Sequence, residues 1–269
     1  MTPVAAVLKS TRKLALALAV LSSPALAQTA RAPVAPAAPA FAATAVQTMP
    51  DGSIQTGRIM KAGDNMRIEL EAGDRSSIQI MRGAEGVAYL VDPASKTYAE
   101  IRDPSVAQAV AGASTPCPLP AEMQAAQMTC KPVGEGKVSG ITTQSWEITT
   151  ANVQGAMRVE WDAGRRRALS QIWPDGTAMT MTFQAMQEFE GRQVEYWATS
   201  LQRPGQPAAI GGWWFDPELL VVVREEMPGG IVRALKDIQV GPIDPAMFMP
   251  PEGFTRVEAQ PAPATGGGQ

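Results

Sequence analysis

Residues 211–230 read GGWWFDPELLVVVREEMPGG, and this stretch is apolar on both sides of any strand that it forms. Neighbouring side chains of a strand point to opposite faces of the sheet. Trp213 and Phe215 therefore face one way, and Trp214 faces the other. A sheet that packs on one core needs only one apolar face, so the second face requires a cover. The protein's own chain, a lipid-like ligand and a protein partner all remain open as that cover.

The same stretch contains a turn signal that recurs along the chain. Its segment WWFDP, residues 213–217, resembles YLVDP at 89–93 and, more loosely, VEWDA at 159–163. An aspartate accepts backbone N–H groups at the first position of a type I turn, and proline supplies the φ angle that the second position needs. We therefore interpret Asp92 and Asp216 as turn residues and not as catalytic carboxylates.

Other turn signals divide the chain into strands. PDG occurs at 50–52 and 174–176, and PGG occurs at 228–230. The apolar or alternating runs between the turns predict strands near residues 54–61, 65–71, 76–82, 86–91, 96–101, 145–150, 155–161, 167–173, 177–185, 192–201, 210–215, 219–226 and 231–240. Short connections of this kind predict a mainly antiparallel meander. The pattern breaks at residues 103–128, where we expect two short helices, at 105–111 and 119–128.

The two cysteines of the chain, Cys117 and Cys130, bracket the second of these helices. A close, even pair in an exported protein predicts a disulfide. The pair is too widely spaced for a Cys-x-x-Cys redox motif, and a zinc site would need further ligands in a chain that has no histidine.

The first 27 residues have the pattern of a cleaved secretory signal. Lys9, Arg12 and Lys13 precede a short apolar run at 14–21, and ALA at 25–27 supplies the cleavage site. Residue 28 is Gln rather than Cys, so a lipoprotein anchor is not expected. No other run reaches the length of a transmembrane helix. We therefore expect an exported, periplasmic protein that does not span the membrane.

Composition divides the remaining chain into three parts. Residues 28–40 are almost entirely Ala and Pro and predict a disordered linker, and residues 259–269 predict a disordered tail. Residues 41–258 suffice for one domain. Without the three cations of the signal, 23 − 3 = 20 Lys and Arg oppose 26 Asp and Glu, a charge of about −6. Nucleic-acid binding is not expected at that balance.

Few residues are suited to catalysis. The absence of histidine excludes Ser-His-Asp and Cys-His arrangements. Glu225 and Glu226 are adjacent, so in a strand they face opposite ways, which does not suit a glycosidase pair. We therefore expect no catalytic residue, no cofactor and no enzyme.

Two further patterns each have a functional and a purely structural interpretation. Met179 and Met181 share a strand face, as do Met247 and Met249, and thioethers bind Cu(I). Without nearby Cys or His, filling of an irregular interior is favoured, and no metal site is expected. The basic run at residues 165–167 either contacts anionic lipid headgroups or, more simply, lies on a solvated loop.

Several segments occur in a recognisable order. They are NMRIEL at 65–70, GVAYLVDP at 86–93, KTY at 96–98, GITTQSW at 140–146, WWFD at 213–216 and PIDPAMFMPPEGF at 242–254. In this order they resemble the LolA/LolB-like bacterial periplasmic proteins, and more closely their uncharacterised, lipoprotein-carrier-like relatives. Carriers of this kind begin with a longer helix before the first strand, where this chain has only residues 41–48.

The resemblance implies a mainly β fold, an incomplete antiparallel β-barrel (a half-barrel meander) that encloses one or two short helices and an apolar hollow. In such carriers the hollow accepts lipid or lipoprotein acyl chains. The residues expected to line it here are Trp146, Met179, Met181, Phe183, Trp213, Trp214, Phe215 and Val221. The expected function is non-catalytic binding or carriage in the cell envelope. The alternative is a protein-interaction module, an envelope-stress sensor or outer-membrane assembly factor, that meets its partner through the apolar face of 211–230.

Overall fold

The computed structural model describes residues 38–72 and 75–259. The predicted signal, most of the predicted linker and residues 260–269 lie outside these ranges. The described chain forms one open sheet of 16 strands. The strands are β1 (Phe41–Thr48), β2 (Ile54–Ala62), β3 (Asn65–Ala72), β4 (Arg75–Arg82), β5 (Val87–Asp92), β6 (Thr97–Arg102), β7 (Met128–Val138), β8 (Ile141–Thr150), β9 (Met157–Asp162), β10 (Arg167–Ile172), β11 (Ala178–Phe189), β12 (Arg192–Gln202), β13 (Ala209–Asp216), β14 (Val221–Glu226), β15 (Val232–Val240) and β16 (Thr255–Val257).

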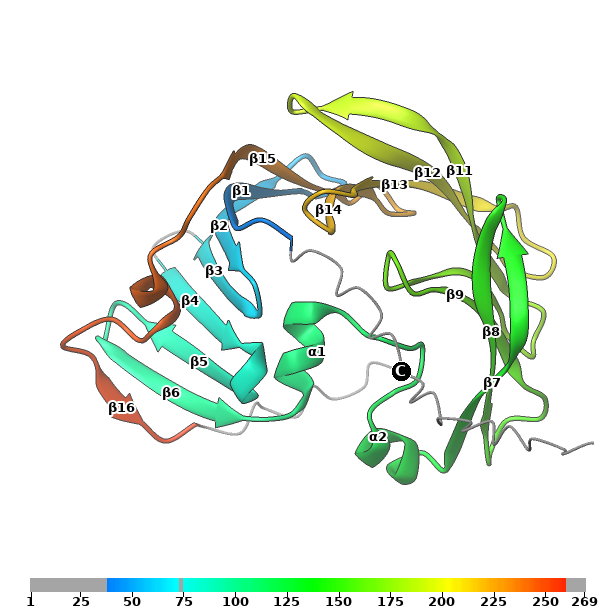
Figure 1. Ribbon diagram of the computed structural model, residues 1–269, viewed down its shortest axis with the longest axis horizontal. Coiled ribbons are helices and arrows are strands. Elements are labelled where there is room, and N and C mark those ends of the chain that lie inside the picture. The colour runs from blue at the N-terminus through cyan, green and yellow to red at the C-terminus, as the bar shows by residue number, and fades with distance from the viewer. Residues whose placement is uncertain (1–37, 73–74, 260–269) are drawn as a thin grey trace, which may run out of the picture. The chain divides into compact units, whose positions relative to one another are not determined.

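Strand β1 joins two meanders into this sheet, the first formed by β2 to β6 and the second by β7 to β15. The order is β16-β6-β5-β4-β3-β2-β1-β15-β14-β13-β12-β11-β10-β9-β8-β7, and every pair is antiparallel except β16 with β6. The sheet curves around α1 (Ser105–Ala111), and α2 (Pro120–Ala125) lies near its opening (Figure 1). The predicted incomplete antiparallel barrel that encloses short helices is therefore confirmed.

Helix α1 covers part of the concave face. Its Val106 and Val110 are buried against Met81 of β4 and Ala88 of β5. Lys61 of β2 donates from Nζ to the carbonyl oxygen of Val110 at 2.5 Å, near the end of the helix. Burial lowers the pKa of this lysine. Helix α1 matches the predicted range, whereas α2 is shorter than the predicted 119–128.

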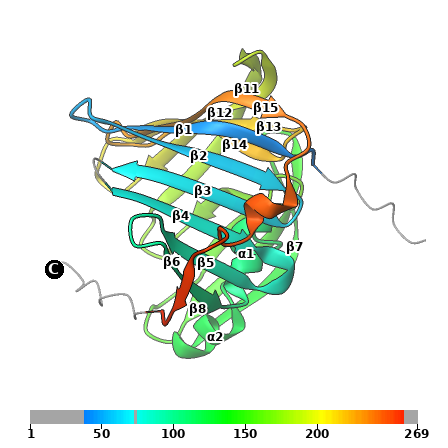
Figure 2. The ribbon, with the colours of Figure 1, turned by 90° about the vertical axis from the view of Figure 1, so that its left-hand side faces the viewer.

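The convex face of the first meander is covered by the closing segment of the chain. Ile243, Met247, Phe248 and Phe254 pack against a buried cluster formed by Met60, Ile80, Val87, Tyr89 and Val91. This segment includes the 3₁₀ helix η2 (Pro245–Phe248) and crosses the outside of the sheet before β16 pairs with β6 (Figure 2). The protein's own chain thus covers the second face of these strands.

Three strands, β1, β7 and β16, were not predicted. Residues 41–48 form β1, whose Phe41 and Ala43 are buried, because they pair with residues 232–240 almost two hundred positions later. Strand β7 escaped prediction because Pro132, Gly134 and Gly136 interrupt it. A register shift between Pro132 and Gly134 accommodates the proline, which an edge strand tolerates.

The predicted aspartate turns are confirmed, in two different environments. Asp92 Oδ1 accepts the backbone N–H of Ala94 at 2.9 Å and is exposed to solvent. Asp216 Oδ1 accepts the N–H groups of Glu218 and Leu219 at 2.9 and 3.0 Å and is 0% exposed. Arg192 Nε pairs with the other oxygen of Asp216, and this hydrogen bond raises the pKa of the guanidinium.

Replacing these two aspartates should have very different effects. Asp216→Ala leaves Arg192 with only the exposed Glu218 at 2.9 Å and removes the buried acceptor of two backbone N–H groups, so we expect a loss of about 3–5 kcal/mol in the free energy of unfolding. Asp92→Ala removes only exposed hydrogen bonds and should cost about 0.5–1.5 kcal/mol. Urea titration of both variants measures the difference, and equal losses would show that burial of the turn is unimportant.

The predicted disulfide joins Cys117 and Cys130, with 5.7 Å between the Cα atoms. Both cysteines pack against a cluster that contains Trp146 and Trp161. Trp161 also donates from Nε1 to the carbonyl oxygen of Ser114 at 3.2 Å. The connection between α1 and α2 is therefore fixed to β7 by the disulfide, and to β8 and β9 by packing against their tryptophans.

A Cys117→Ser/Cys130→Ser double variant should fold but lose about 3 kcal/mol of stability, because the unfolded chain regains the entropy of the open loop. The sheet supplies most of the core, so near-native circular dichroism should persist. Thermal unfolding of the oxidised wild type and the variant tests this, and an unchanged melting temperature would mean that the bond adds no stability.

Candidate functional site

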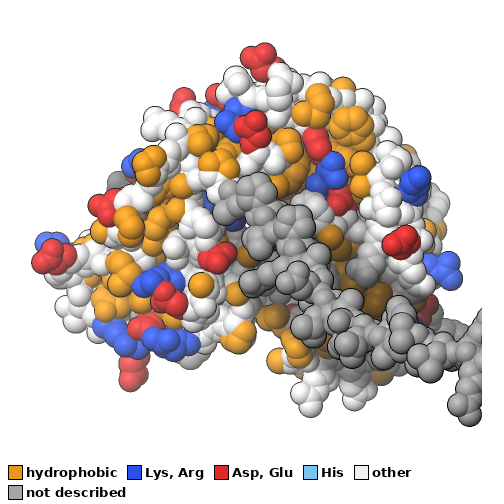
Figure 3. Space-filling model, viewed as in Figure 1, with side chains coloured by type: hydrophobic (Ala, Val, Ile, Leu, Met, Phe, Trp, Pro, Cys, Tyr) orange, Lys and Arg blue, Asp and Glu red, His pale blue; other side chains and the backbone are white. Residues whose placement is uncertain are grey.

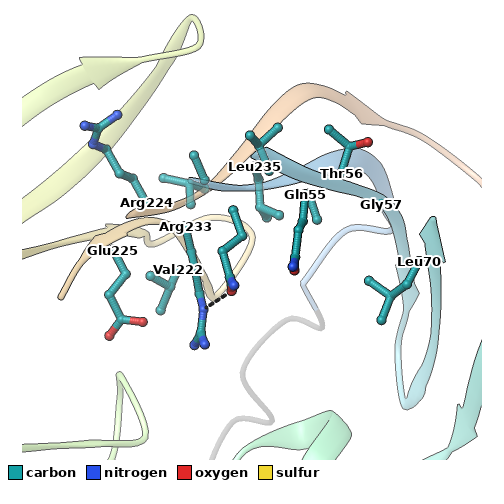
Figure 4. Close-up of a pocket in the computed structure, with 14 residues that line it drawn as sticks. Gln55, Thr56, Gly57, Leu70, Val222, Arg224, Glu225, Arg233 and Leu235 are labelled. Carbon is teal, nitrogen blue, oxygen red and sulfur yellow. Dashed lines mark hydrogen bonds between the residues drawn. The ribbon is translucent and has the colours of Figure 1, made fainter. Parts of the chain in front are cut away.

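A pocket of about 390 Å³ lies on the sheet where β1, β2 and β3 meet β14 and β15 (Figure 4). Its lining residues are Ala45, Val46, Gln47, Gln55, Thr56, Gly57, Leu70, Val222, Val223, Arg224, Glu225, Arg233, Ala234 and Leu235. Ile68 and Met66 pack against the buried cluster that contains Val106 and Val110 of α1. Leu70 lies on the same face of β3 as these two residues, so the pocket belongs to the concave face.

The strand register places the floor of the pocket in one row. Ala45 of β1 is paired with Leu235 of β15 and with Gly57 of β2, and Gly57 is paired with Leu70 of β3. Paired residues share a face, so four strands contribute one apolar row with two small residues in its middle. A Cβ on Gly57 would lie 2.4 Å from the carbonyl oxygen of Glu69 and 3.0 Å from Leu70 Cδ2, so this position admits only glycine.

A polar row runs beside the apolar row. Arg233 of β15 is paired with Glu225 of β14 and with Gln47 of β1, and Gln47 is paired with Gln55 of β2. Arg233 Nε donates to Gln47 Oε1 at 2.9 Å. Glu225 accepts instead from Arg167 Nη2 at 3.3 Å. The pocket therefore has an apolar side and a hydrogen-bonding side, and Arg224 points away from both (Figure 4).

Three of the predicted site residues form a core beside the pocket. Met181, Trp213 and Phe215 are buried together with Leu169 and Trp197. The rings of Trp213 and Phe215 stack with centroids 5.2 Å apart. None of the three lines the pocket, and Trp213 Nε1 has no hydrogen-bond partner among the described residues.

Two arginines cover the tryptophans of this core. Arg165 Cζ lies 5.0 Å from the ring centroid of Trp197, and Arg167 Cζ lies 4.7 Å from that of Trp213. Arg165 also donates to Glu195 at 2.6 Å, and this hydrogen bond raises the pKa of its guanidinium. Burial lowers the pKa of Arg167, and Glu225 opposes that effect.

The interpretation of 165–167 as a solvated loop is therefore wrong for two of its three residues. Arg165 and Arg167 are held over indole rings by ion pairs, and only Arg166 is exposed, with a hydrogen bond to the carbonyl oxygen of Ala111. Glu225 and Glu226 do face opposite ways, since Glu225 belongs to the polar row and Glu226 pairs with Arg224.

The other predicted site residues lie in several places. Trp146 belongs to the buried cluster against which the disulfide packs, and Val221 packs against the cluster of Phe41 and Leu219. Met179 is half-buried on β11, and Phe183 is 37% exposed with its ring edge-on to Trp197. Their predicted role in lining a ligand site stays a prediction.

Trp214 lies on the face opposite to Trp213. It stacks on Tyr196 with ring centroids 4.6 Å apart, and Arg224 Cζ lies 5.3 Å from its ring. Gly212 provides the room, because a Cβ there would lie 2.5 Å from the Trp214 ring. The stretch 211–230 is thus apolar on two faces because it contributes to a buried core on one and to a half-buried stack on the other.

A second cavity of about 590 Å³ lies between the two helices and the loop that joins them. Its lining includes Gln108, Cys117, Leu119, Met123 and Arg166. Within residues 38–72 and 75–259, no group of three or more His, Cys, Asp or Glu could hold a metal ion. In the same ranges, no helix is long and apolar enough to cross a membrane. Figure 3 shows apolar, basic and acidic side chains interspersed over one face of the molecule.

No protein-family model matches the chain, and no curated protein does either. Solved structures that resemble it include the LolA superfamily protein NE2245 from Nitrosomonas europaea, at 9% identity over 79% of this chain and 90% of that one, with a TM-score of 0.36. An uncharacterised conserved protein from Thermus thermophilus has 8% identity over 82% and 91%, and a TM-score of 0.30. MucB in its complex with MucA from Pseudomonas aeruginosa has 11% identity over 76% and 94%, and a TM-score of 0.21.

A LolA superfamily protein is thus among the solved structures that the chain resembles, as the order of its sequence segments indicated.

The two neighbouring tryptophans should differ sharply in their contribution to stability. Trp213→Ala opens a cavity in a packed core and should cost about 3–5 kcal/mol. Trp214→Ala removes a half-buried stack and should cost about 0.5–1.5 kcal/mol beyond the lost surface burial. Chemical denaturation of both variants provides the comparison. A larger loss for Trp214→Ala would contradict the assignment of faces.

Proposed function

We propose that this protein is a non-catalytic binding or carrier-like protein of the cell envelope, and that its concave pocket holds an acyl chain of a lipid or lipoprotein. The proposal includes export to the periplasm through the signal predicted at residues 1–27. The observation that carries it is the apolar row Leu235, Ala45, Gly57 and Leu70, which crosses four strands.

The shape of this row favours a chain over a bulkier group. Ala45 and Gly57 make a shallow channel between Leu235 and Leu70, and Val222 adds an apolar wall. The volume of about 390 Å³ is near the lower end of the range of small-molecule sites, roughly 300–1,000 Å³. Each buried methylene group contributes about 0.8 kcal/mol, so affinity should rise with chain length.

Filling the channel should weaken binding. Ala45→Phe places a ring on the floor and should weaken binding of a fluorescent fatty-acid probe at least about tenfold, the effect of losing about two buried methylenes. Thr44→Phe is the matched control, because Thr44 is the half-buried neighbour on the opposite face of β1. Fluorescence titration of the folded variants gives the affinities, and native mass spectrometry of protein from its own periplasm identifies any bound lipid.

A wild type that binds no probe and carries no lipid would overturn this proposal, as would equal binding by Ala45→Phe. The second candidate, a protein-interaction module, is favoured by the half-buried stack of Trp214 on Tyr196 on the opposite face. A dimer or captured partner that Trp214→Asp abolishes, in protein that binds no lipid probe, would support that candidate instead.

A further inference from the structure

The polar row beside the apolar channel is not needed to hold a hydrocarbon chain. We propose that this row is a headgroup subsite that selects an anionic head, a carboxylate or phosphate, with Arg233 as its principal donor. The inference rests on the proposed function and deepens it, because it specifies which acyl-chain compounds the pocket takes.

The charges around the row leave Arg233 available. Glu225 is the register partner of Arg233, yet its carboxylate is engaged by Arg167 at 3.3 Å. Arg167 is in turn held over the ring of Trp213, so this ion pair is part of the packed core. Within the described residues Arg233 makes no ion pair, and its one side-chain hydrogen bond is to a neutral amide, Gln47.

The geometry of Arg233 suits an anion with two oxygens. Its Nε is used by Gln47, which orients the guanidinium and leaves the terminal nitrogens as donors. These nitrogens point away from the sheet on the same side as Gln55 and Leu70 (Figure 4). A guanidinium presents its donors in a planar fork that matches carboxylate or phosphate oxygens. Gln55 offers a further amide donor two strands away.

The polar row and the apolar row lie next to each other, so a ligand's headgroup and its chain would be bound at the same time. Arg233 and Leu235 are two residues apart on β15, as are Gln47 and Ala45 on β1, so both pairs share the concave face. A ligand whose head lies on the first row therefore starts its chain beside the second. A simple exposed arginine would show no dependence on the chain, and this difference makes the inference testable.

The experiment compares dodecanoate, dodecyl phosphate and neutral monododecanoylglycerol, each below its critical micelle concentration, by displacement of a fluorescent fatty-acid probe. Wild type should bind the two anionic compounds about tenfold more tightly than the neutral one, since a hydrogen bond to a charged group contributes on that order. Arg233→Gln should remove this preference and leave the affinity for the neutral compound unchanged. Arg58→Gln is the control, because Arg58 is exposed on the opposite face of β2 and its loss changes the net charge equally.

The outcomes distinguish failure of the headgroup subsite from failure of the proposed acyl-chain binding. If no alkyl compound binds the wild type, the proposed function fails. If all three compounds bind equally, or if Arg233→Gln keeps the preference, the headgroup subsite is overturned while the channel stands. Equal losses in Arg58→Gln and Arg233→Gln would assign the preference to overall charge and overturn it too. Inorganic phosphate should displace dodecyl phosphate no better than chloride at equal ionic strength, and full displacement would indicate a site for free phosphate.

Discussion

The pairing of β1 with both β2 and β15 is the constraint on which the domain depends. Strand β1 hydrogen-bonds on one side to β2, the next strand in the sequence, and on the other side to β15, near the end of the domain. Without β1 the two meanders would have no common sheet. The pocket would also be absent, because the middle of both of its rows comes from Ala45 and Gln47. Fold and candidate site are thus set by the same long-range contact, which must be strong enough to offset the entropy of closing so large a loop.

The apolar surface of this sheet is covered in a different way on each of the two meanders. The closing segment of the chain covers the convex face of the first meander. Arginines held by carboxylates cover the tryptophans of the second. A cation over an aromatic face is attracted by the electrons of the ring and also keeps a charge at the boundary with water. Arg165 and Arg167 lie over Trp197 and Trp213, whereas the pocket lies where the side chains of Ala45 and Gly57 are small.

Local signals were sufficient to predict most of the sheet, both aspartate turns, α1 and the disulfide, because each depends on residues that are close in sequence. Strand β1 could not be predicted, since its partner strand is distant and its own residues are mostly Ala and Thr. The candidate site was missed for a related reason. Large aromatic residues suggest a ligand-lined hollow, and in this fold Trp213 and Phe215 are buried in a core beside the pocket. The channel exists where Ala45 and Gly57 leave space, and only the register of four strands shows that these residues are neighbours.

The open sheet also has to avoid pairing with other molecules. Strand β7 is one end of the strand order, so one of its edges presents backbone groups that could template another strand. Its sequence opposes this: Pro132 lacks an N–H group, and Lys131, Glu135 and Lys137 bring charge to the edge. The bulge at Pro132 and Gly134 further disturbs the regular spacing that an incoming strand would need. The same breaks that hide β7 from sequence analysis therefore protect a half-closed barrel, at high concentration, from growing into fibres.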